Sequence, residues 1–532
     1  MQRIEIYDTT LRDGSQSEGV SFSLQDKMLI CHRLDELGVD FIEGGYPLSN
    51  PKDAAFFQEA RGLKLQTAKL LAFGMTRRKG LSAAEDVGLK ALRDAQTEYV
   101  TVVGKTWDLH VTEVLGVSLQ ENLDMIADSV AYLTGEGRKV IYDAEHFFDG
   151  FKANPDYALK TIAVAAQAGA VLVCLCDTNG GSLPEQVTQC VRQARHTLST
   201  PIGIHPHNDS GLAVANALAA VAAGAVQVQG TINGIGERCG NVDITTVIAN
   251  LRLKMGYDCL KKDSLIHLTE TSKYIYEIAN LNLVNNQPYT GASAFAHKGG
   301  MHVHAVNKIA GSYEHVVPEL VGNSRRILVS ELSGVSNIAA KAGKKFNILH
   351  DRDTLKKVLD QITELENQGY QFEAAEASFE LIVRRQIGRL RKFFDLKSYR
   401  CAISRQANGK PVTKATLSVI ANKREINASA EGDGPINALD AALRYALEPE
   451  FPAIADLHLV DYKVRVVNGR AESAAKVRVI IEFRSPEGVF GTIGVSENII
   501  EASWQAIADA VEYRLIHAEE AAAKVPPANA AV

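Results

Sequence analysis

The sequence predicts an α/β protein: a (β/α)8 TIM barrel followed by a small helical linker region and a C-terminal α+β domain. Three observations support this prediction. Short apolar or β-branched runs alternate with segments of helical period as far as about residue 256, which is the pattern of βα units. Eight such units in about 250 residues match the size of a (β/α)8 barrel. Beyond this point the alternation stops, and strands and helices follow in another order.

The eight expected strands are short apolar runs, most of which end in polar residues. They are Arg3–Asp8, Val39–Glu43, Thr67–Phe73, Tyr99–Val103, Lys139–Ala144, Ala170–Asp177, Ile202–His207 and Ala225–Thr231. The helices expected between them include Leu24–Leu37, Leu81–Ala95, Leu119–Leu133, Pro155–Ala168, Pro184–Leu198 and Gly211–Ala223. Proline near the first turn of several helices fits this assignment. The competing architecture is a doubly wound open sheet, but no G-x-G-x-x-G motif follows the first strand.

The rest of the chain predicts separate, smaller units. Two helices, Thr354–Gln368 and Phe372–Ile387, flank Gly369, a good helix terminator. Three strands and a helix are expected in 398–447 and again in 456–516, with helices at Pro435–Leu447 and Asn498–Ile516, which indicates a duplicated β-β-β-α unit. The expected domains are a barrel at 1–280, linker and lid subdomains at 281–390, a C-terminal domain at 391–520 and a flexible tail at 521–532.

Composition excludes several classes of protein. The 532 residues are 46% hydrophobic and 23% charged with a formal net charge of -6, so the chain is neither largely disordered nor basic enough for a dedicated nucleic-acid binder. No apolar run reaches the ~18 residues of a membrane span. The N-terminus has acidic residues where a signal peptide needs a basic start. Seven cysteines without a CxxC pair fit reduced thiols. We expect a cytoplasmic protein without nucleic-acid or membrane partners.

Polar residues follow six of the eight expected strands, at the end of a barrel where catalytic residues gather. Among them, His205 and His207 are spaced i, i+2 and share one side of a strand. Two neutral imidazoles with a carboxylate suit a divalent transition ion, or magnesium held more weakly. Asp13 and Asn241 follow the first and eighth strands, so they are expected nearby. Two satisfied histidines are the alternative. The glycine-rich segment 234–240 could cradle a phosphate but lacks the Walker pattern and its Lys.

Three segments together resemble the α-isopropylmalate, homocitrate and citramalate synthase family of metal-dependent Claisen-type condensing enzymes. They are Asp8-Thr9-Thr10-Leu11-Arg12-Asp13-Gly14-Ser15-Gln16, His205-Pro206-His207-Asn208-Asp209 and Gly234-Ile235-Gly236-Glu237-Arg238-Cys239-Gly240-Asn241. Gly432-Asp433-Gly434-Pro435 extends the likeness to the family's C-terminal regulatory domain. Segments 142–150 and 495–504 look most like the citramalate branch. The family usually has Glu where Ser15 stands, so any support that Glu gives must come from elsewhere.

The resemblance implies a set of roles at the barrel mouth. Asp13, His205, His207 and Asn241 are the implied ligands of a divalent metal, Mn, Mg, Zn or Co, with acetyl-CoA as co-substrate and pyruvate as acceptor. The metal would activate the keto carbon. Arg12, which keeps its charge, would stabilise the alkoxide and enolate oxygens unless it serves only as an ion-pair partner of Glu43 or Glu145. Thr178 would bind the substrate carboxylate.

The base is implied by the resemblance as a carboxylate–imidazole couple. Glu145 and His302 match the family pattern, with Tyr313 as a proton donor or thioester contact. A His activated by a carboxylate suits proton abstraction near neutral pH. His297 and His304 are offered from the same segment and remain alternatives. In family members this segment covers the other subunit's site, which implies a homodimer.

The C-terminal repeat shows no catalytic cluster, and the resemblance implies that it binds an end-product amino acid, isoleucine for the citramalate branch. Gly432–Pro435 and Gly494–Asn498 are expected to be loops before helices, so Gly434 and Gly494 are the candidate regulatory positions. A helix N-terminus there could bind a carboxylate. A domain that serves only dimerisation is the alternative.

Three other functions compete with pyruvate condensation. A different acceptor, 3-methyl-2-oxobutanoate or 2-oxoglutarate, would make the protein an isopropylmalate or homocitrate synthase. A related lyase or biotin-dependent carboxyltransferase would share the barrel, but the latter needs a Met-Lys-Met segment that the sequence lacks. A non-enzymatic amino-acid sensor predicts erosion of the ligand set, which is intact here.

Overall fold

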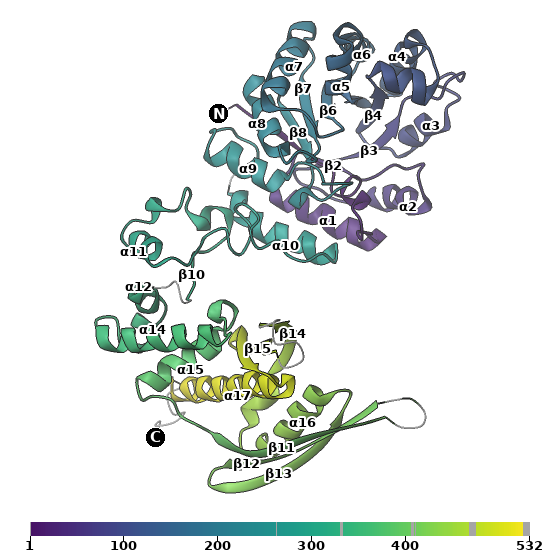
Figure 1. The fold of residues 1–532 in the computed structure, drawn as a ribbon. Helices are drawn as coiled ribbons and strands as arrows, with labels where there is room; N and C mark the ends of the chain where they lie inside the picture. The colour runs from purple at the N-terminus through teal and green to yellow at the C-terminus, as the bar shows by residue number, and fades with distance from the viewer. Residues whose placement is uncertain are drawn as a thin grey trace, which may run out of the picture. The chain divides into compact units, whose positions relative to one another are not determined.

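The computed structural model describes residues 2–261, 263–329, 334–405, 409, 411–467 and 475–524. This part of the chain forms two compact units (Figure 1). One comprises the described residues up to Phe295 together with Val316–Arg325, and the other comprises Ala296–His315 and the described residues from Arg326 onward. The finer division at residues 280 and 390 stays a prediction.

The first unit is a closed barrel of eight parallel strands in chain order, as predicted (Figure 1). The barrel closes where β8 pairs with β1, and in this pairing Gln227 lies opposite Glu5. The strands are β1 Glu5–Asp8, β2 Phe41–Glu43, β3 Lys69–Met75, β4 Tyr99–Lys105, β5 Lys139–Glu145, β6 Leu172–Asp177, β7 Ile202–Pro206 and β8 Gln227–Gly230. Each lies within a predicted strand or overlaps it.

Helices alternate with these strands, and their ends follow local capping. The helices of this unit are α1 Leu24–Leu37, α2 Pro51–Ala60, α3 Val87–Asp94, α4 Leu119–Gly135, α5 Phe147–Ala153, α6 Pro155–Gln167, α7 Pro184–Thr197, α8 Ala213–Ala223, α9 Ile244–Leu253 and α10 Leu268–Ile278. A capping box between Ser23 and Asp26 starts α1, and Gly38 in the left-handed conformation (φ 89°) ends it.

The predicted helix at Leu81–Ala95 begins too early. The Asp86 side chain accepts hydrogen bonds from the backbone N–H groups of Gly88 and Leu89, so α3 starts at Val87. Sequence reasoning also missed α2, although Asn50 caps it and Pro51 occupies its first turn.

An apolar cluster packs in the barrel interior, and polar groups gather where the strands end. The apolar cluster consists of Tyr7, Phe41, Leu71, Ile141, Leu172 and Cys174, all buried. Cys176, two residues after Cys174, is also buried. The polar residues that follow the strands therefore stand above a solid core, which holds their backbone in place.

The second unit begins with short elements and two longer helices. They are β9 Ala296–His297, α11 Gly300–Lys308, β10 Arg326–Ile327, α12 Val335–Ile338, α13 Lys344–Phe346, α14 Arg352–Asn367 and α15 Glu376–Gln386. The two predicted helices correspond to α14 and α15. Gly369, at φ 109°, ends the first of them, as expected.

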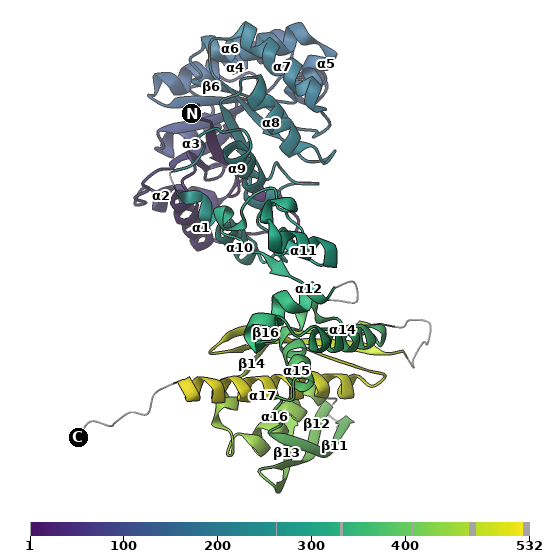
Figure 2. The ribbon, with the colours of Figure 1, turned by 90° about the vertical axis from the view of Figure 1, so that its left-hand side faces the viewer.

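The predicted repeat is confirmed: two three-stranded antiparallel sheets are each followed by a helix (Figure 2). The first repeat contains β11 Phe394–Arg405, β12 Pro411–Ala421, β13 Arg424–Gly432 and α16 Pro435–Leu447; the second contains β14 His458–Val466, β15 Val477–Ser485, β16 Gly488–Ser496 and α17 Ile499–Lys524. The helix α16 packs on β12 and β13, and α17 packs on β15 and β16. Both repeats contribute to one apolar core.

The helix α17 continues into the segment 521–532, for which a flexible tail was expected. Residues up to Lys524 are helical because the Ala- and Glu-rich end of α17 consists of strong helix formers. Residues 525–532 lie outside the described part of the chain.

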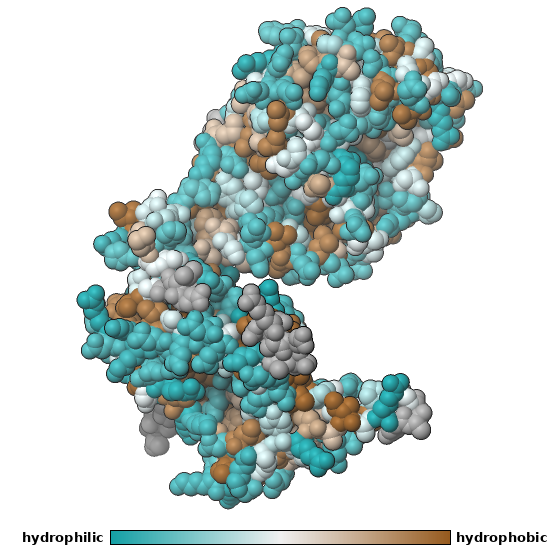
Figure 3. All heavy atoms as spheres, viewed as in Figure 1, coloured by the Kyte–Doolittle hydropathy of each residue, from teal (hydrophilic) through white to brown (hydrophobic). Residues whose placement is uncertain are grey.

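Figure 3 shows hydrophilic residues over most of the visible face, with apolar residues scattered among them. Among the described residues, none of the helices is both long enough and apolar enough to span a bilayer.

Candidate active site

A buried cluster of charges lies where the chain leaves β1. The Arg12 guanidinium donates through Nε to Glu43 and through Nη1 to Asp13. The Tyr7 hydroxyl donates to Glu43, whose side chain is fully buried. The guanidinium also stacks over the Phe73 ring, 3.9 Å from its centroid. The ion pair with Glu43 foreseen for Arg12 is therefore present, and it fixes the guanidinium at the barrel mouth.

Ser15 has a local role in place of the family's Glu. Its Oγ donates a 2.7 Å hydrogen bond to the Arg12 carbonyl oxygen and so holds the turn that presents Arg12. The support for the guanidinium itself comes from Glu43 on β2.

Three expected metal ligands meet between the first, seventh and eighth strands. The Asn241 amide nitrogen lies 3.1 Å from His205 Nε2 and 3.3 Å from Asp13 Oδ2. His205 Nε2 is itself 3.3 Å from Asp13 Oδ2. The fourth, His207, forms an isolated antiparallel bridge with Asn241, and its ring centroid lies 5.4 Å from that of His205.

The chemistry of these residues fits a divalent cation. Burial opposes the charge of Asp13, but Arg12 and the two histidines outweigh it and lower the pKa of this carboxyl. Burial and His205 lower the pKa of His207 to about 3, so its imidazole is neutral and can act as a ligand. His207 Nδ1 and Asn241 Oδ1 are buried and have no hydrogen-bond partner among the residues that the structure describes. A nitrogen and oxygen donor set of this kind matches divalent metals.

A second possible metal cluster lies deeper in the barrel. Among the described residues, only Asp143, Cys174 and Cys176 bring three acidic, thiol or imidazole ligand atoms within 4.8 Å of one another. Burial raises the pKa of Cys174 well above its usual range. Interaction with Cys174 favours the Cys176 thiolate, but burial and nearby carboxylates raise the pKa of Cys176 to about 11. Since thiolates are the metal-binding form, we favour the Asp13 site.

Six predicted residues line one cavity of about 280 Å³ at the C-terminal ends of the strands: Arg12, Asp13, Glu145, Thr178, His205 and His207. The Thr178 hydroxyl accepts a 2.9 Å hydrogen bond from the backbone N–H of His146. Arg238 donates to the Thr178 carbonyl oxygen and to both oxygens of Asp209, which ties the ends of three strands together. Glu145 pairs with Lys105.

The remaining predicted catalytic residues belong to the second unit. The rings of His302 and Tyr313 stack with centroids 4.1 Å apart, and both side chains are exposed. His297 is buried and its Nε2 lies 3.1 Å from Glu314 Oε1, which gives it a structural partner. His304 is exposed. The coupling of Glu145 with His302 stays a prediction.

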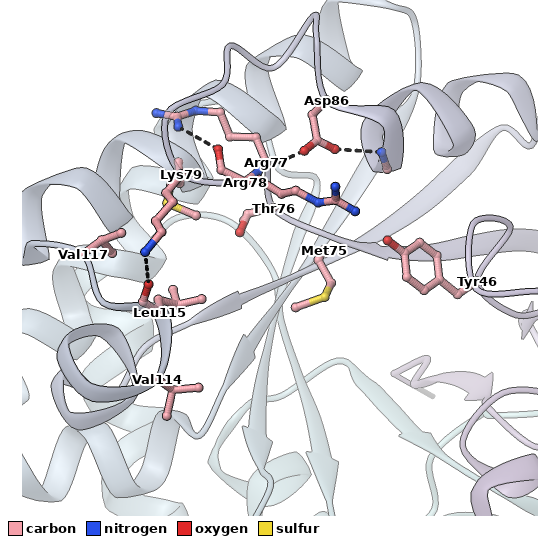
Figure 4. Close-up of a pocket in the computed structure, with 12 residues that line it drawn as sticks. Tyr46, Met75, Thr76, Arg77, Arg78, Lys79, Asp86, Val114, Leu115 and Val117 are labelled. Carbon is pink, nitrogen blue, oxygen red and sulfur yellow. Dashed lines mark hydrogen bonds between the residues drawn. The ribbon is translucent and has the colours of Figure 1, made fainter.

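A second cavity, of about 490 Å³, adjoins the first and was missed by sequence reasoning (Figure 4). Tyr46 and Met75 line both cavities. Arg77, Arg78 and Lys79 line the second, directly after β3. Arg77 is buried and paired with acidic residues, whereas Arg78 and Lys79 are exposed. Three consecutive cationic residues after a barrel strand are the signal that could have identified this cavity.

The two candidate regulatory glycines differ in their surroundings. Gly434 precedes α16, and a Cβ added there would meet no atom of the described part of the chain within 4 Å. Gly494 does not belong to a loop: it lies in β16 opposite Val479. A Cβ at Gly494 would lie 1.9 Å from the Ala502 carbonyl oxygen, so the absence of a side chain lets β16 approach α17.

Comparison with protein families divides the chain into three matched segments. Residues 3–275 match the HMGL-like family. Residues 289–370 match the homocitrate synthase post-HMGL domain-like family. Residues 373–515 match the LeuA allosteric (dimerisation) domain.

Individual relatives match nearly the whole chain. The (R)-citramalate synthase of Geobacter sulfurreducens is 51% identical over 98% of this chain and 99% of that protein. The (R)-citramalate synthase of Aquifex aeolicus is 50% identical over the same shares of the two chains. The 2-isopropylmalate synthase of Methanocaldococcus jannaschii is 30% identical over 97% of this chain and 96% of that protein. This chain therefore belongs to the (R)-citramalate synthase family of HMGL-like proteins.

Proposed function

We propose that this protein condenses acetyl-CoA with pyruvate and water to give (R)-citramalate and CoA. The observation that carries the proposal is that the relatives sharing about half of its residues are (R)-citramalate synthases, whereas the 2-isopropylmalate synthase is more distant. The single cavity that gathers six predicted site residues supports an active enzyme. A sensor with an inactive barrel would have no use for this intact set.

Asp13, His205, His207 and Asn241 would hold a divalent metal, Mn, Mg, Zn or Co. When bound, the metal would act as a Lewis acid on the keto group of pyruvate. Asp13 is anionic and His207 neutral at neutral pH, as ligation requires.

Arg12 and Thr178 would orient pyruvate in the cavity. The Arg12 guanidinium, held by Glu43 and Asp13, stays charged and stabilises negative charge that develops on the keto oxygen. The Thr178 oxygen accepts the His146 N–H, so its own hydrogen is free to donate to the pyruvate carboxylate. Both groups are fixed before substrate binds, which reduces the reorganisation needed during reaction.

Glu145 and His302 would form the base that removes a proton from the acetyl methyl group, with Tyr313 beside His302. The stacking of His302 on Tyr313 supports a joint role for these two residues. The resulting carbon nucleophile attacks the keto carbon, and the keto oxygen takes a proton to become the tertiary hydroxyl. Water then hydrolyses the thioester and releases CoA.

The cavity beside the active site would take the phosphates of acetyl-CoA. It shares Tyr46 and Met75 with the catalytic cavity. An acetyl-CoA molecule whose thioester lies in the catalytic cavity can therefore extend its phosphates into the second cavity. Arg78 and Lys79 are exposed cations at its wall, with Met75 and Val114 as exposed apolar neighbours (Figure 4). Cations suit phosphates, and the apolar side chains suit the pantetheine arm.

The match to the LeuA allosteric (dimerisation) domain supports a homodimer regulated by an amino acid. Citramalate formation is the first step of the pyruvate route to 2-oxobutanoate and isoleucine, so isoleucine is the expected inhibitor. We place the enzyme in the cytoplasm, because its seven cysteines are free thiols, as is usual in a reducing compartment.

The acceptor is tested by a free-thiol assay of CoA release with pyruvate, 2-oxobutanoate, 3-methyl-2-oxobutanoate and 2-oxoglutarate. We expect the highest kcat/KM with pyruvate. A preference for 3-methyl-2-oxobutanoate or 2-oxoglutarate would instead make the protein an isopropylmalate or homocitrate synthase. No CoA release with any acceptor in metal-supplemented buffer would favour the inactive barrel.

Replacing Arg78 by Ala should raise KM for acetyl-CoA about tenfold, because it removes one charge-assisted hydrogen bond to a phosphate. KM for pyruvate should stay unchanged. The matched control is Arg192→Ala, an exposed arginine on α7 outside both cavities. Equal acetyl-CoA KM values for the two variants would place the CoA phosphates elsewhere.

An Asp introduced at Gly434 should relieve isoleucine inhibition by at least about tenfold, because its charge would repel the isoleucine carboxylate at the start of α16. The open space at Gly434 predicts that this variant folds. The effect is measured as the change in the isoleucine concentration that halves the rate. The kcat without isoleucine should change less than about twofold. Lys423→Asp, at the opposite end of β13, should remain sensitive. Stronger inhibition by leucine than by isoleucine, or unchanged sensitivity of Gly434→Asp, would contradict this prediction.

A further inference from the structure

A row of buried amides runs through the barrel beneath the metal site. Gln227 and Gln229 are two residues apart on β8, and their side chains are almost fully buried. Because alternate residues of a strand share one side, both lie on the same side of the strand. Neither residue has a role in the chemistry described so far.

The hydrogen bonds of these amides run in one direction. Gln227 Nε2 donates to Glu5 Oε2 at 3.0 Å, which leaves Gln227 Oε1 as an acceptor. Gln229 Nε2 lies 3.3 Å from Gln227 Oε1 and 3.1 Å from Asp143 Oδ1, so it faces two acceptors. Gln229 Oε1 is left facing His205 Nδ1, at 2.9 Å.

This arrangement decides which ring nitrogen of His205 carries hydrogen. A carbonyl oxygen beside Nδ1 requires a hydrogen on Nδ1, and a neutral imidazole then has a lone pair on Nε2. On the other side of the ring, the Asn241 amide nitrogen lies 3.1 Å from Nε2 and can donate to it. Asp13 Oδ2 lies 3.3 Å from the same Nε2 and 3.3 Å from the Asn241 amide nitrogen, so this carboxylate can accept from Asn241 while Nε2 keeps its lone pair. Turning the Gln229 amide over would place its oxygen against Gln227 Oε1.

We propose that Gln229, oriented by Gln227, is a positioning residue that holds His205 in the tautomer with a free Nε2 lone pair and thereby sets metal affinity. The proposal rests on the metal site of the proposed function. Outer partners of metal-ligating histidines commonly change affinity by 10- to 100-fold when they are removed. Asp143 contributes by accepting from the same amide nitrogen.

The test measures the dissociation constant of Mn²⁺ on the metal-stripped full-length chain, by calorimetry, without substrates or turnover. Gln229→Met keeps the length of the side chain but removes both hydrogen-bonding groups, and we expect affinity to fall at least about tenfold. Gln229→Glu keeps an oxygen that accepts from Nδ1–H, and its second oxygen, protonated in this buried position, replaces the amide nitrogen as the donor to Gln227 and Asp143. Its affinity should stay within about threefold of that of the unmodified chain. The control is Asn216→Leu, which removes a buried amide on α8 that donates to the Ser182 carbonyl; its affinity should not change.

The outcomes distinguish failure of the positioning role of Gln229 from failure of the metal site. If His207→Ala binds Mn²⁺ as well as the unmodified chain does, the metal site of the proposed function is wrong. If His207→Ala weakens Mn²⁺ binding but Gln229→Met does not, only the positioning role of Gln229 is wrong. Equal losses in Gln229→Glu and Gln229→Met would also overturn it, because the acceptor would then not matter. Should Gln229→Met fail to fold, Gln227→Met supplies the test, since Gln229 loses the acceptor that orients it; unchanged affinity in that variant would contradict the proposal.

Discussion

The buried ion pairs of Arg12 with Glu43 and Asp13 are the interaction on which the barrel mouth depends. A guanidinium between two carboxylates satisfies charges that would be costly to bury alone, and removing one partner of a buried pair typically costs about 3–5 kcal/mol. The cluster joins the loop after β1 to β2. Thr10 links the same loop to the end of β8, because its hydroxyl accepts the Ile232 N–H at 2.9 Å. Asn241 follows in that segment, so the loop that carries Asp13 and the loop that carries Asn241 are held together.

Polar groups in the barrel are arranged by depth. Tyr7 and Leu71 belong to a cluster of buried residues that pack against one another in the barrel interior. Gln227 and Gln229 form a polar path through the interior, and its last amide contacts His205. Above it lies the cavity with Arg12 and Thr178. His205 is contacted from below by Gln229, whereas Arg12 is held by Glu43 and Asp13 and Thr178 by the His146 N–H. Each group is fixed by a partner of its own, which is how a rigid scaffold can preorganise a site.

The strand–helix alternation was sufficient to predict the barrel, and the polar residues after the strands were sufficient to predict most of its cavity. The repeat in the C-terminal domain was visible because each copy has its own strands and helix. Gln229 was missed because a glutamine in an apolar run carries no signal until its neighbours in space are known. Gly494 was misplaced since only the close approach of α17 explains it. The Arg77–Lys79 run was overlooked because charged residues after a strand are usually solvated.

Diffraction from crystals soaked with Mn²⁺ and pyruvate, with an anomalous difference map, tests the central claim most directly. We predict one strong peak among Asp13, His205, His207 and Asn241, with pyruvate between this peak and the Arg12 guanidinium. A peak at Asp143, Cys174 and Cys176, or Mn²⁺ and pyruvate bound at separate sites, would contradict the account.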